Sequence, residues 1–77
     1  MEQSFRFFII QDEVSGGKTH YNVISKKHGY LLGIINYFQR WGRWVLVPDD
    51  DTFFSSDCLY DLMKFINQLD REGKKNG

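Results

Sequence analysis

One cysteine and two histidines are the residues of this chain that most readily supply a nucleophile and a general base. Cys58 falls in a segment of helical periodicity, His20 in a segment of strand character, and His28 in a lysine-rich turn. Their positions in the sequence do not bring a nucleophile, a base and an orienting group together. Cys58 is therefore predicted to be a buried structural thiol and both histidines to be structural or solvated. No catalytic residue and no enzymatic activity are predicted.

The densest carboxylate run is Asp49 to Asp51, and carboxylate oxygens are the ligands that hard cations prefer. The run lacks the alternating ligands, central glycine and terminal glutamate of an EF-hand loop. The chain also lacks zinc-ligand spacing, a P-loop and a dinucleotide-binding glycine pattern. The aspartates are predicted to form a solvated loop, and neither a metal nor a cofactor is predicted.

The stretch NYFQRWGRWVLVP, residues 36–48, concentrates aromatic and basic side chains. Arginine and tryptophan carry much of the binding energy at protein interfaces, and both stack on nucleic-acid bases. This stretch therefore supplies four candidate binding residues at or beside a predicted turn, Phe38, Arg40, Trp41 and Arg43, and the strand before the turn adds Ile34.

Four segments with the composition of β-strands must position these residues. They span residues 5–11, 19–25, 30–38 and 43–47. Turn residues separate them, and Pro48, which has no amide proton, ends the last. Short turns between consecutive strands predict a four-stranded antiparallel meander.

Beyond the aspartates the apolar period changes from two to 3.6, which predicts one amphipathic helix. Ser55 or Ser56 is expected to cap it. Its apolar side contains Cys58, Leu59, Leu62, Phe65, Ile66 and Leu69. The predicted fold class is therefore α+β, a four-stranded antiparallel meander sheet packed on one C-terminal α-helix (ββββα). Residues 1–72 are predicted to form a single domain and residues 73–77 a flexible tail.

One face of the sheet must pack on the apolar side of the helix, and the other face is then open. Strand alternation places Leu32, Ile34, Asn36 and Phe38 on one face, and the polar Asn36 marks it as the outer one. Trp44 is predicted to point inward beside Tyr37. The outer face is expected to show Ile34, Phe38, Val45 and Val47.

Ten basic and ten acidic residues cancel, so the chain lacks the strong positive field of proteins that bind duplex nucleic acid mainly through phosphates. A single cysteine excludes an internal disulfide and indicates a reducing compartment, so a cytoplasmic location is expected. The apolar run near the N-terminus is too short for a membrane span or a signal sequence. No contact with a membrane is predicted.

The segment from Lys27 to Leu69 resembles a group of short uncharacterised proteins of bacteria, phages and other mobile elements. Their pattern is a K-x-G-x-x-LG-x-I strand, an aromatic hairpin, a proline, a T-x-F loop and a CL-x-D-[IL]-x-x-FI helix. The matching residues include Lys27, Gly29, Leu32, Gly33, Ile35, Tyr37, Trp41, Trp44, Pro48, Thr52, Phe53, Phe54, Cys58, Leu59, Asp61, Leu62, Phe65 and Ile66. The resemblance implies a mobile-element context and no particular activity.

These features favour a small non-enzymatic protein-protein interaction module, an accessory or anti-defence factor of a phage or other mobile element. Self-association, for example as a homodimer, is one form of this hypothesis, because unpaired strand edges invite pairing. The alternative is a nucleic-acid-binding domain that uses the sheet face and the hairpin turn between Arg40 and Arg43.

Overall fold

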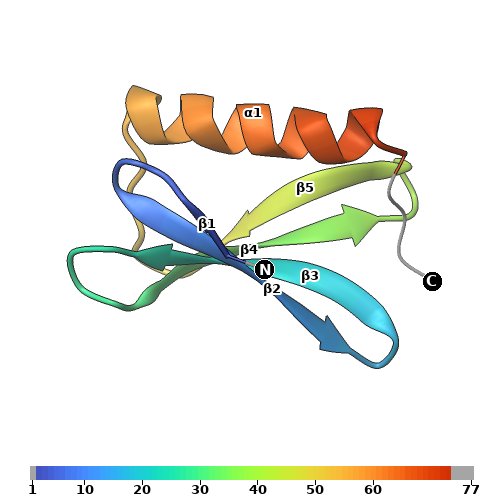
Figure 1. Cartoon of the computed structure of the whole chain (residues 1–77), viewed down its shortest axis with the longest axis horizontal. Coiled ribbons are helices and arrows are strands. Elements are labelled where there is room, and N and C mark those ends of the chain that lie inside the picture. The colour runs from blue at the N-terminus through green and yellow to red at the C-terminus, as the bar shows by residue number, and fades with distance from the viewer. Residues whose placement is uncertain (1, 74–77) are drawn as a thin grey trace.

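The strand-forming segments pair in chain order into one antiparallel sheet, and a single helix follows them (Figure 1). The structure is a computed structural model that describes residues 2–73. Its elements are β1 (Glu2–Ser4), β2 (Phe8–Ser15), β3 (Lys18–Ser25), β4 (Leu31–Phe38), β5 (Arg43–Pro48) and α1 (Ser56–Arg71). The predicted α+β class, with an antiparallel sheet and a C-terminal helix, is confirmed.

The prediction of four strands was one short of the five that residues 2–73 form. The additional strand, β1, consists of three exposed polar residues, so it has no hydrophobic alternation by which it could be recognised. Gln11 Nε2 on β2 donates to Glu2 Oε1 on β1 at 2.9 Å. The predicted start of the next strand was also wrong: a turn closed by Phe5 N donating to Phe8 O at 2.8 Å delays β2 to Phe8.

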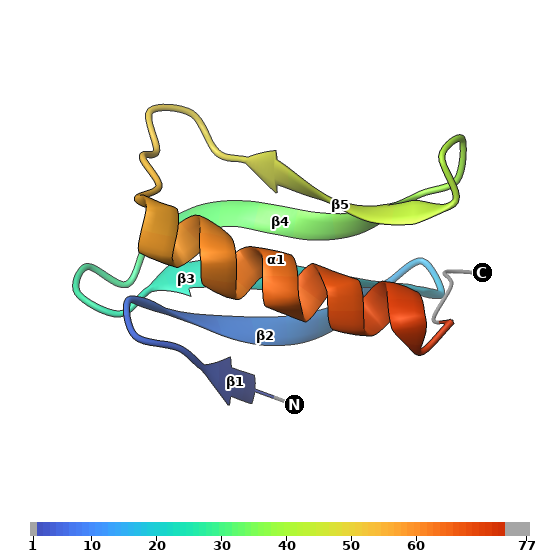
Figure 2. The ribbon, with the colours of Figure 1, turned by 90° about the horizontal axis from the view of Figure 1, so that it is seen from above.

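Helix α1 runs diagonally across one face of the sheet (Figures 1 and 2). Three helix residues, Leu62, Phe65 and Leu69, are buried against five from the strands. The strand residues of this core are Phe8, Ile10, Val23, Ile35 and Trp44. No other described element covers the opposite face, which we call the open face.

The helix begins where a hydrogen-bonded cap satisfies its first free amides. Ser55 is the N-cap, and its Oγ accepts from Cys58 N at 3.3 Å. Leu59 was predicted to lie on the buried stripe, and this was wrong, because its side chain is 50% exposed. The buried positions of the helix are 62, 65 and 69, which form a narrower stripe than the predicted apolar side. Leu59 lies outside this stripe and points away from the sheet.

One residue of β4 departs from simple alternation. The pairing of β3 with β4 shifts between Val23 and Ile24, so that Val23 faces Gly33 whereas Ile24 faces Leu31. The shift leaves Leu32 as the extra residue of a bulge, and its side chain packs against the core. The prediction that Leu32 lies on the outer face was therefore wrong.

The sheet has β1 at one edge and β5 at the other, and the register of β5 shows which of its backbone groups point outward. Asp49 N donates to Leu32 O at 2.9 Å, next to the opposed pair Gly33 and Pro48. Because hydrogen-bonded and non-hydrogen-bonded pairs alternate in antiparallel sheets, the N–H groups of Trp44 and Leu46 point away from β4.

Most of the donors on this edge are removed or occupied. Trp44 N donates to the Asp70 carboxylate of α1 at 3.2 Å, and Pro48 has no N–H group. Among the described residues, Leu46 is then the residue of β5 whose outward N–H has no partner. A further strand added at β5 would find only one available donor along these six residues.

Gly33 on β4 leaves no room for a side chain beside β5. A Cβ atom at this position would be 2.9 Å from Val47 O and 3.1 Å from Pro48 Cα, both backbone atoms. We expect Gly33→Ala to lower the free energy of unfolding by about 1–3 kcal/mol, because the strands must shift to admit the methyl group. Urea unfolding followed by circular dichroism measures the change. The exposed Asn36→Ala on the same strand is the control, and equal midpoints for the two variants would contradict the expectation.

The flexible tail predicted for residues 73–77 lies, apart from Gly73, outside the described residues. Within residues 2–73, α1 is neither long enough nor apolar enough to span a membrane.

Candidate functional site

A tight turn joins β4 to β5 at one end of the sheet (Figure 2), and all the predicted binding residues except Ile34 lie in it or directly beside it. Trp41 N and Gly42 N both donate to Phe38 O, at 3.1 and 2.9 Å. Gly42 has φ +64°, a conformation that glycine adopts without the steric cost of a Cβ atom. This backbone fixes Trp41 at the end of the hairpin.

Trp41 and Phe38 form an aromatic pair on the surface. Their ring centroids are 4.9 Å apart and their planes meet at 87°, an edge-to-face contact. The Trp41 side chain is nevertheless 67% exposed, and Phe38 is 39% exposed. An indole held by a neighbouring ring but open to solvent can bury a large area against a partner with little loss of conformational freedom.

Trp44, unlike Trp41, is a core residue, as predicted from strand alternation. It is only 4% exposed and makes edge-to-face contacts with Tyr21 and Tyr37, at centroid distances of 5.5 and 5.6 Å. The prediction that Trp44 points inward beside Tyr37 is confirmed. The two tryptophans of the hairpin therefore separate into one core residue and one surface residue.

Arg40 and Arg43 lie on either side of Trp41 and are both exposed. Neither forms an ion pair with a residue of the 2–73 range. We refer to Phe38, Arg40, Trp41 and Arg43 as the hairpin tip. It presents two aromatic rings and two guanidinium groups with donors available to a partner.

The open face continues from the hairpin tip with aliphatic side chains. Ile34 is half-buried and faces Val47, which is 51% exposed, while Val45 is half-buried beside the exposed Asn36. Ile34, Val45 and Val47 thus extend the apolar surface of Phe38 along β4 and β5. The predicted composition of this part of the outer face, Leu32 excepted, is confirmed.

Beside the aliphatic side chains, the open face of β2 and β3 is polar at the end that carries the hairpin tip. Asn22 Nδ2 donates to Glu13 Oε1 at 2.8 Å, and His20 Nε2 lies 3.5 Å from the same oxygen. These contacts occupy one donor of the Asn22 amide and a carboxylate oxygen of Glu13. Asn22, the cross-strand neighbour of Ile34, therefore interrupts the apolar surface at this end, whereas the half-buried Ile9, Ile24 and Leu31 oppose one another on the open face toward the other end.

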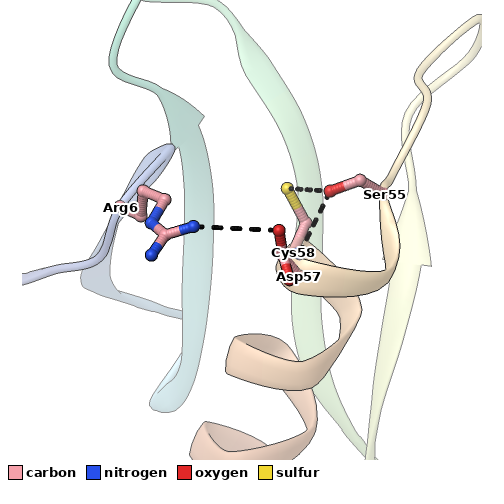
Figure 3. A network of polar contacts seen from close by, with 4 residues as sticks. All are labelled: Arg6, Ser55, Asp57 and Cys58. Carbon is pink, nitrogen blue, oxygen red and sulfur yellow. Dashed lines mark hydrogen bonds and ion pairs between the residues drawn. The ribbon is translucent and has the colours of Figure 1, made fainter.

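Cys58 lies at the start of α1 (Figure 3). Ser55 Oγ is 3.4 Å from its sulfur and also accepts from its backbone N–H. The thiol is half-buried and packs against the core, so the prediction of a buried thiol overestimated its burial. The nearby Arg6–Asp57 pair, 3.8 Å apart, joins two exposed side chains and adds little stability.

The two histidines make their contacts with residues other than Cys58. His20 contacts Glu13 on the open face, and His28 stacks on Tyr30 with ring centroids 5.3 Å apart. Across residues 2–73, no group of three or more His, Cys, Asp or Glu side chains is arranged to hold a metal ion.

A groove along the C-terminal half of α1 was missed by sequence reasoning. Its volume is about 710 Å³, and it is lined by residues of α1, by Gln3 and Phe5, and by Arg43. No role in binding was predicted for the helix residues Lys64, Asn67 and Gln68. Their proximity to β1 and β5 depends on how the helix crosses the sheet, which the local sequence pattern does not contain.

Comparisons of the chain with protein-family models, with curated proteins and with solved structures found no match. The function is therefore inferred from the residues and their arrangement.

Proposed function

We propose that this protein is a non-enzymatic binding module whose hairpin tip and adjoining open face contact another protein. The observation that carries the proposal is Trp41, a large aromatic side chain that is 67% exposed yet held in place by Phe38. Exposed tryptophan and arginine side chains beside an apolar surface are the composition that concentrates binding energy at protein interfaces. The resemblance of the segment 27–69 to mobile-element proteins supports an accessory or anti-defence role in the cytoplasm of a bacterial host.

The neighbouring surface favours a protein partner over nucleic acid. Next to the hairpin tip are the aliphatic side chains of Ile34, Val45 and Val47, which offer apolar contact but no ring on which a base can stack. The planes of the Phe38 and Trp41 rings are also nearly perpendicular, at 87°, so two successive stacked bases cannot lie flat on both rings. A protein surface with apolar side chains and carboxylates matches both the aliphatic area and the two arginines.

The proposal is tested by affinity capture from bacterial lysate with the wild type and two variants. Trp41→Ala is expected to abolish recovery of the partner, because it removes the largest exposed ring of the tip. Phe53→Ala is the matched control, since Phe53 is an aromatic residue that is 90% exposed in the loop before α1. Equal recovery by the wild type and both variants would show that the tip is not the binding surface.

Self-association through the open face is a second form of the same proposal. The β5 edge offers few donors, whereas the open face presents the aliphatic side chains of Ile34, Val45 and Val47. Sedimentation velocity distinguishes the two forms. A concentration-dependent dimer that Val47→Lys dissociates is the outcome expected if the partner is a second copy.

Nucleic-acid binding is kept as the alternative because Arg40 and Arg43 flank Trp41 without ion-pair partners among the described residues. Fluorescence anisotropy with labelled single-stranded DNA and RNA at low salt tests it. Binding that weakens in Arg40→Ala and Arg43→Ala, with a shallower salt dependence, would replace the protein-partner proposal.

A further inference from the structure

The groove beside α1 carries a concentration of positive charge that the neutral net charge of the chain conceals. Three basic side chains line it: Arg43 from β5 and Lys64 and Arg71 from α1. One carboxylate, Asp70, also lines it, and this group accepts the backbone N–H of Trp44 at 3.2 Å. The local balance of cations over anions favours an anionic ligand.

The remaining lining is suited to a polypeptide. The amide side chains of Gln3, Asn67 and Gln68 can both donate to and accept from peptide groups. Phe5 and Phe65 supply the apolar part of the lining. A volume of about 710 Å³ lies within the range of about 300–1,000 Å³ typical of ligand sites.

We infer that this groove binds an acidic peptide segment of the protein partner, with carboxylates of the segment paired to Arg43, Lys64 and Arg71. The inference deepens the proposed function and rests on it for the identity of the partner as a protein. Arg43 joins the two surfaces, because it belongs to the hairpin tip and also lines the groove. A partner that contacts Trp41 can therefore extend a neighbouring segment along α1.

The same lining disfavours a nucleic-acid strand. The Phe65 side chain is only 8% exposed, and Phe5 stacks on Phe8 with centroids 5.0 Å apart, so neither residue offers the open ring platform that bases need. The carboxylate of Asp70 would also repel the phosphate backbone of a nucleic acid, which carries one negative charge per nucleotide. In a peptide, acidic residues can be spaced to avoid Asp70.

A second cavity of about 380 Å³ adjoins the groove and limits where the acidic residues can lie. The two share Gln3, Phe65 and Gln68, but the second cavity is lined by the carboxylates of Asp12 and Glu72. Anionic side chains are therefore favoured only along the part of the helix that carries Lys64 and Arg71.

The test is a titration of the ¹⁵N-labelled protein, followed by NMR, with a synthetic ten-residue peptide of glutamate, glycine and one tyrosine. The peptide is expected to shift the amide signals of Lys64, Asn67 and Arg71. Replacing the two groove cations that α1 supplies, Lys64→Gln with Arg71→Gln, is expected to weaken binding about tenfold, from the usual strength of exposed ion pairs. The matched control, Lys26→Gln with Lys27→Gln, removes the same charge from the exposed β3–β4 turn and is expected to change affinity less than about twofold.

Three results would overturn the inference: equal weakening by the control pair, equal binding of a peptide in which glutamine replaces glutamate, or tighter binding of a ten-nucleotide oligothymidine at the same signals. Affinity capture separates this failure from failure of the proposed function. If the groove variant still recovers the partner and Trp41→Ala does not, the groove inference fails and the hairpin tip remains the binding surface. If the groove binds the peptide but Trp41→Ala recovers the partner normally, the proposed role of the tip fails.

Discussion

Replacing Trp44 by alanine is expected to lower the free energy of unfolding by about 3–5 kcal/mol, the usual cost of removing a large buried aromatic side chain. The side chain is 4% exposed and contacts the rings of Tyr21 and Tyr37 edge to face, so its removal leaves a cavity that rigid neighbours cannot fill. A chain of 77 residues has a total stability of about 4–10 kcal/mol, so much of the variant population is expected to be unfolded at 37 °C.

The matched control is the other tryptophan of the same hairpin. Trp41→Ala removes the same side chain from a position that is 67% exposed. It is expected to cost about 1 kcal/mol or less, which is the range for its single edge-to-face contact with Phe38. Urea unfolding is followed by far-ultraviolet circular dichroism, because each substitution alters tryptophan fluorescence directly. Similar midpoints for the two variants would contradict the division into a core and a surface tryptophan.

The second large effect is expected on the helix. Leu62 is 2% exposed and is one of the three buried contacts of α1 with the sheet. Leu62→Ala is expected to cost about 2–5 kcal/mol through lost burial and the cavity left behind. The change is measured from thermal and urea unfolding at several protein concentrations, so that any contribution of self-association is separated from folding.

Leu59→Ala is the control for this substitution, because it makes the same change one turn earlier on the helix at a side chain that is 50% exposed. Its expected effect is within about 0.5 kcal/mol, as for surface substitutions in general. A large loss of stability in Leu59→Ala would mean that its exposed face is covered in solution, and sedimentation velocity would then identify a second copy as the cover.

The sequence predicts well those features that depend on alternation within one segment. Tyr37 follows the polar Asn36 and Trp44 follows the charged Arg43, so alternation places both on the helix side, where they are opposed across β4 and β5. The same counting leaves Phe38 and Ile34 outside. The separation of Trp44 from Trp41 follows because the turn at Gly42 interrupts the strand between them.

Features that depend on pairing between segments were missed. β1 exists because three polar residues hydrogen-bond to β2, and an exposed edge needs no hydrophobic pattern. Leu32 packs inward because the register of β3 against β4 shifts, which neither strand records in its own sequence. Leu59 was wrongly predicted to be buried because six apolar residues share one side of the helix in the sequence pattern. Only those that face the sheet are buried.

Of the two candidate sites, the hairpin tip could be predicted from the sequence and the groove could not. The hairpin tip is continuous in sequence, so its aromatic and basic composition can be recognised directly from the order of its residues. The groove combines Gln3, Arg43 and Lys64 from three separate elements, and each of these residues alone resembles an ordinary solvated side chain. Only the diagonal path of α1 across the sheet brings them together.

The hydrogen bond from Trp44 N to Asp70, together with Pro48, has a consequence for the behaviour of the protein at high concentration. Growth of an amyloid-like stack requires successive strands to find a regular row of donors and acceptors on the edge they join. On β5 that row is interrupted at Trp44 and at Pro48, so an incoming strand of the same chain cannot continue the ladder past Leu46. The protein can therefore display Trp41, Phe38 and an aliphatic face to a partner without offering β5 as a template for fibrils.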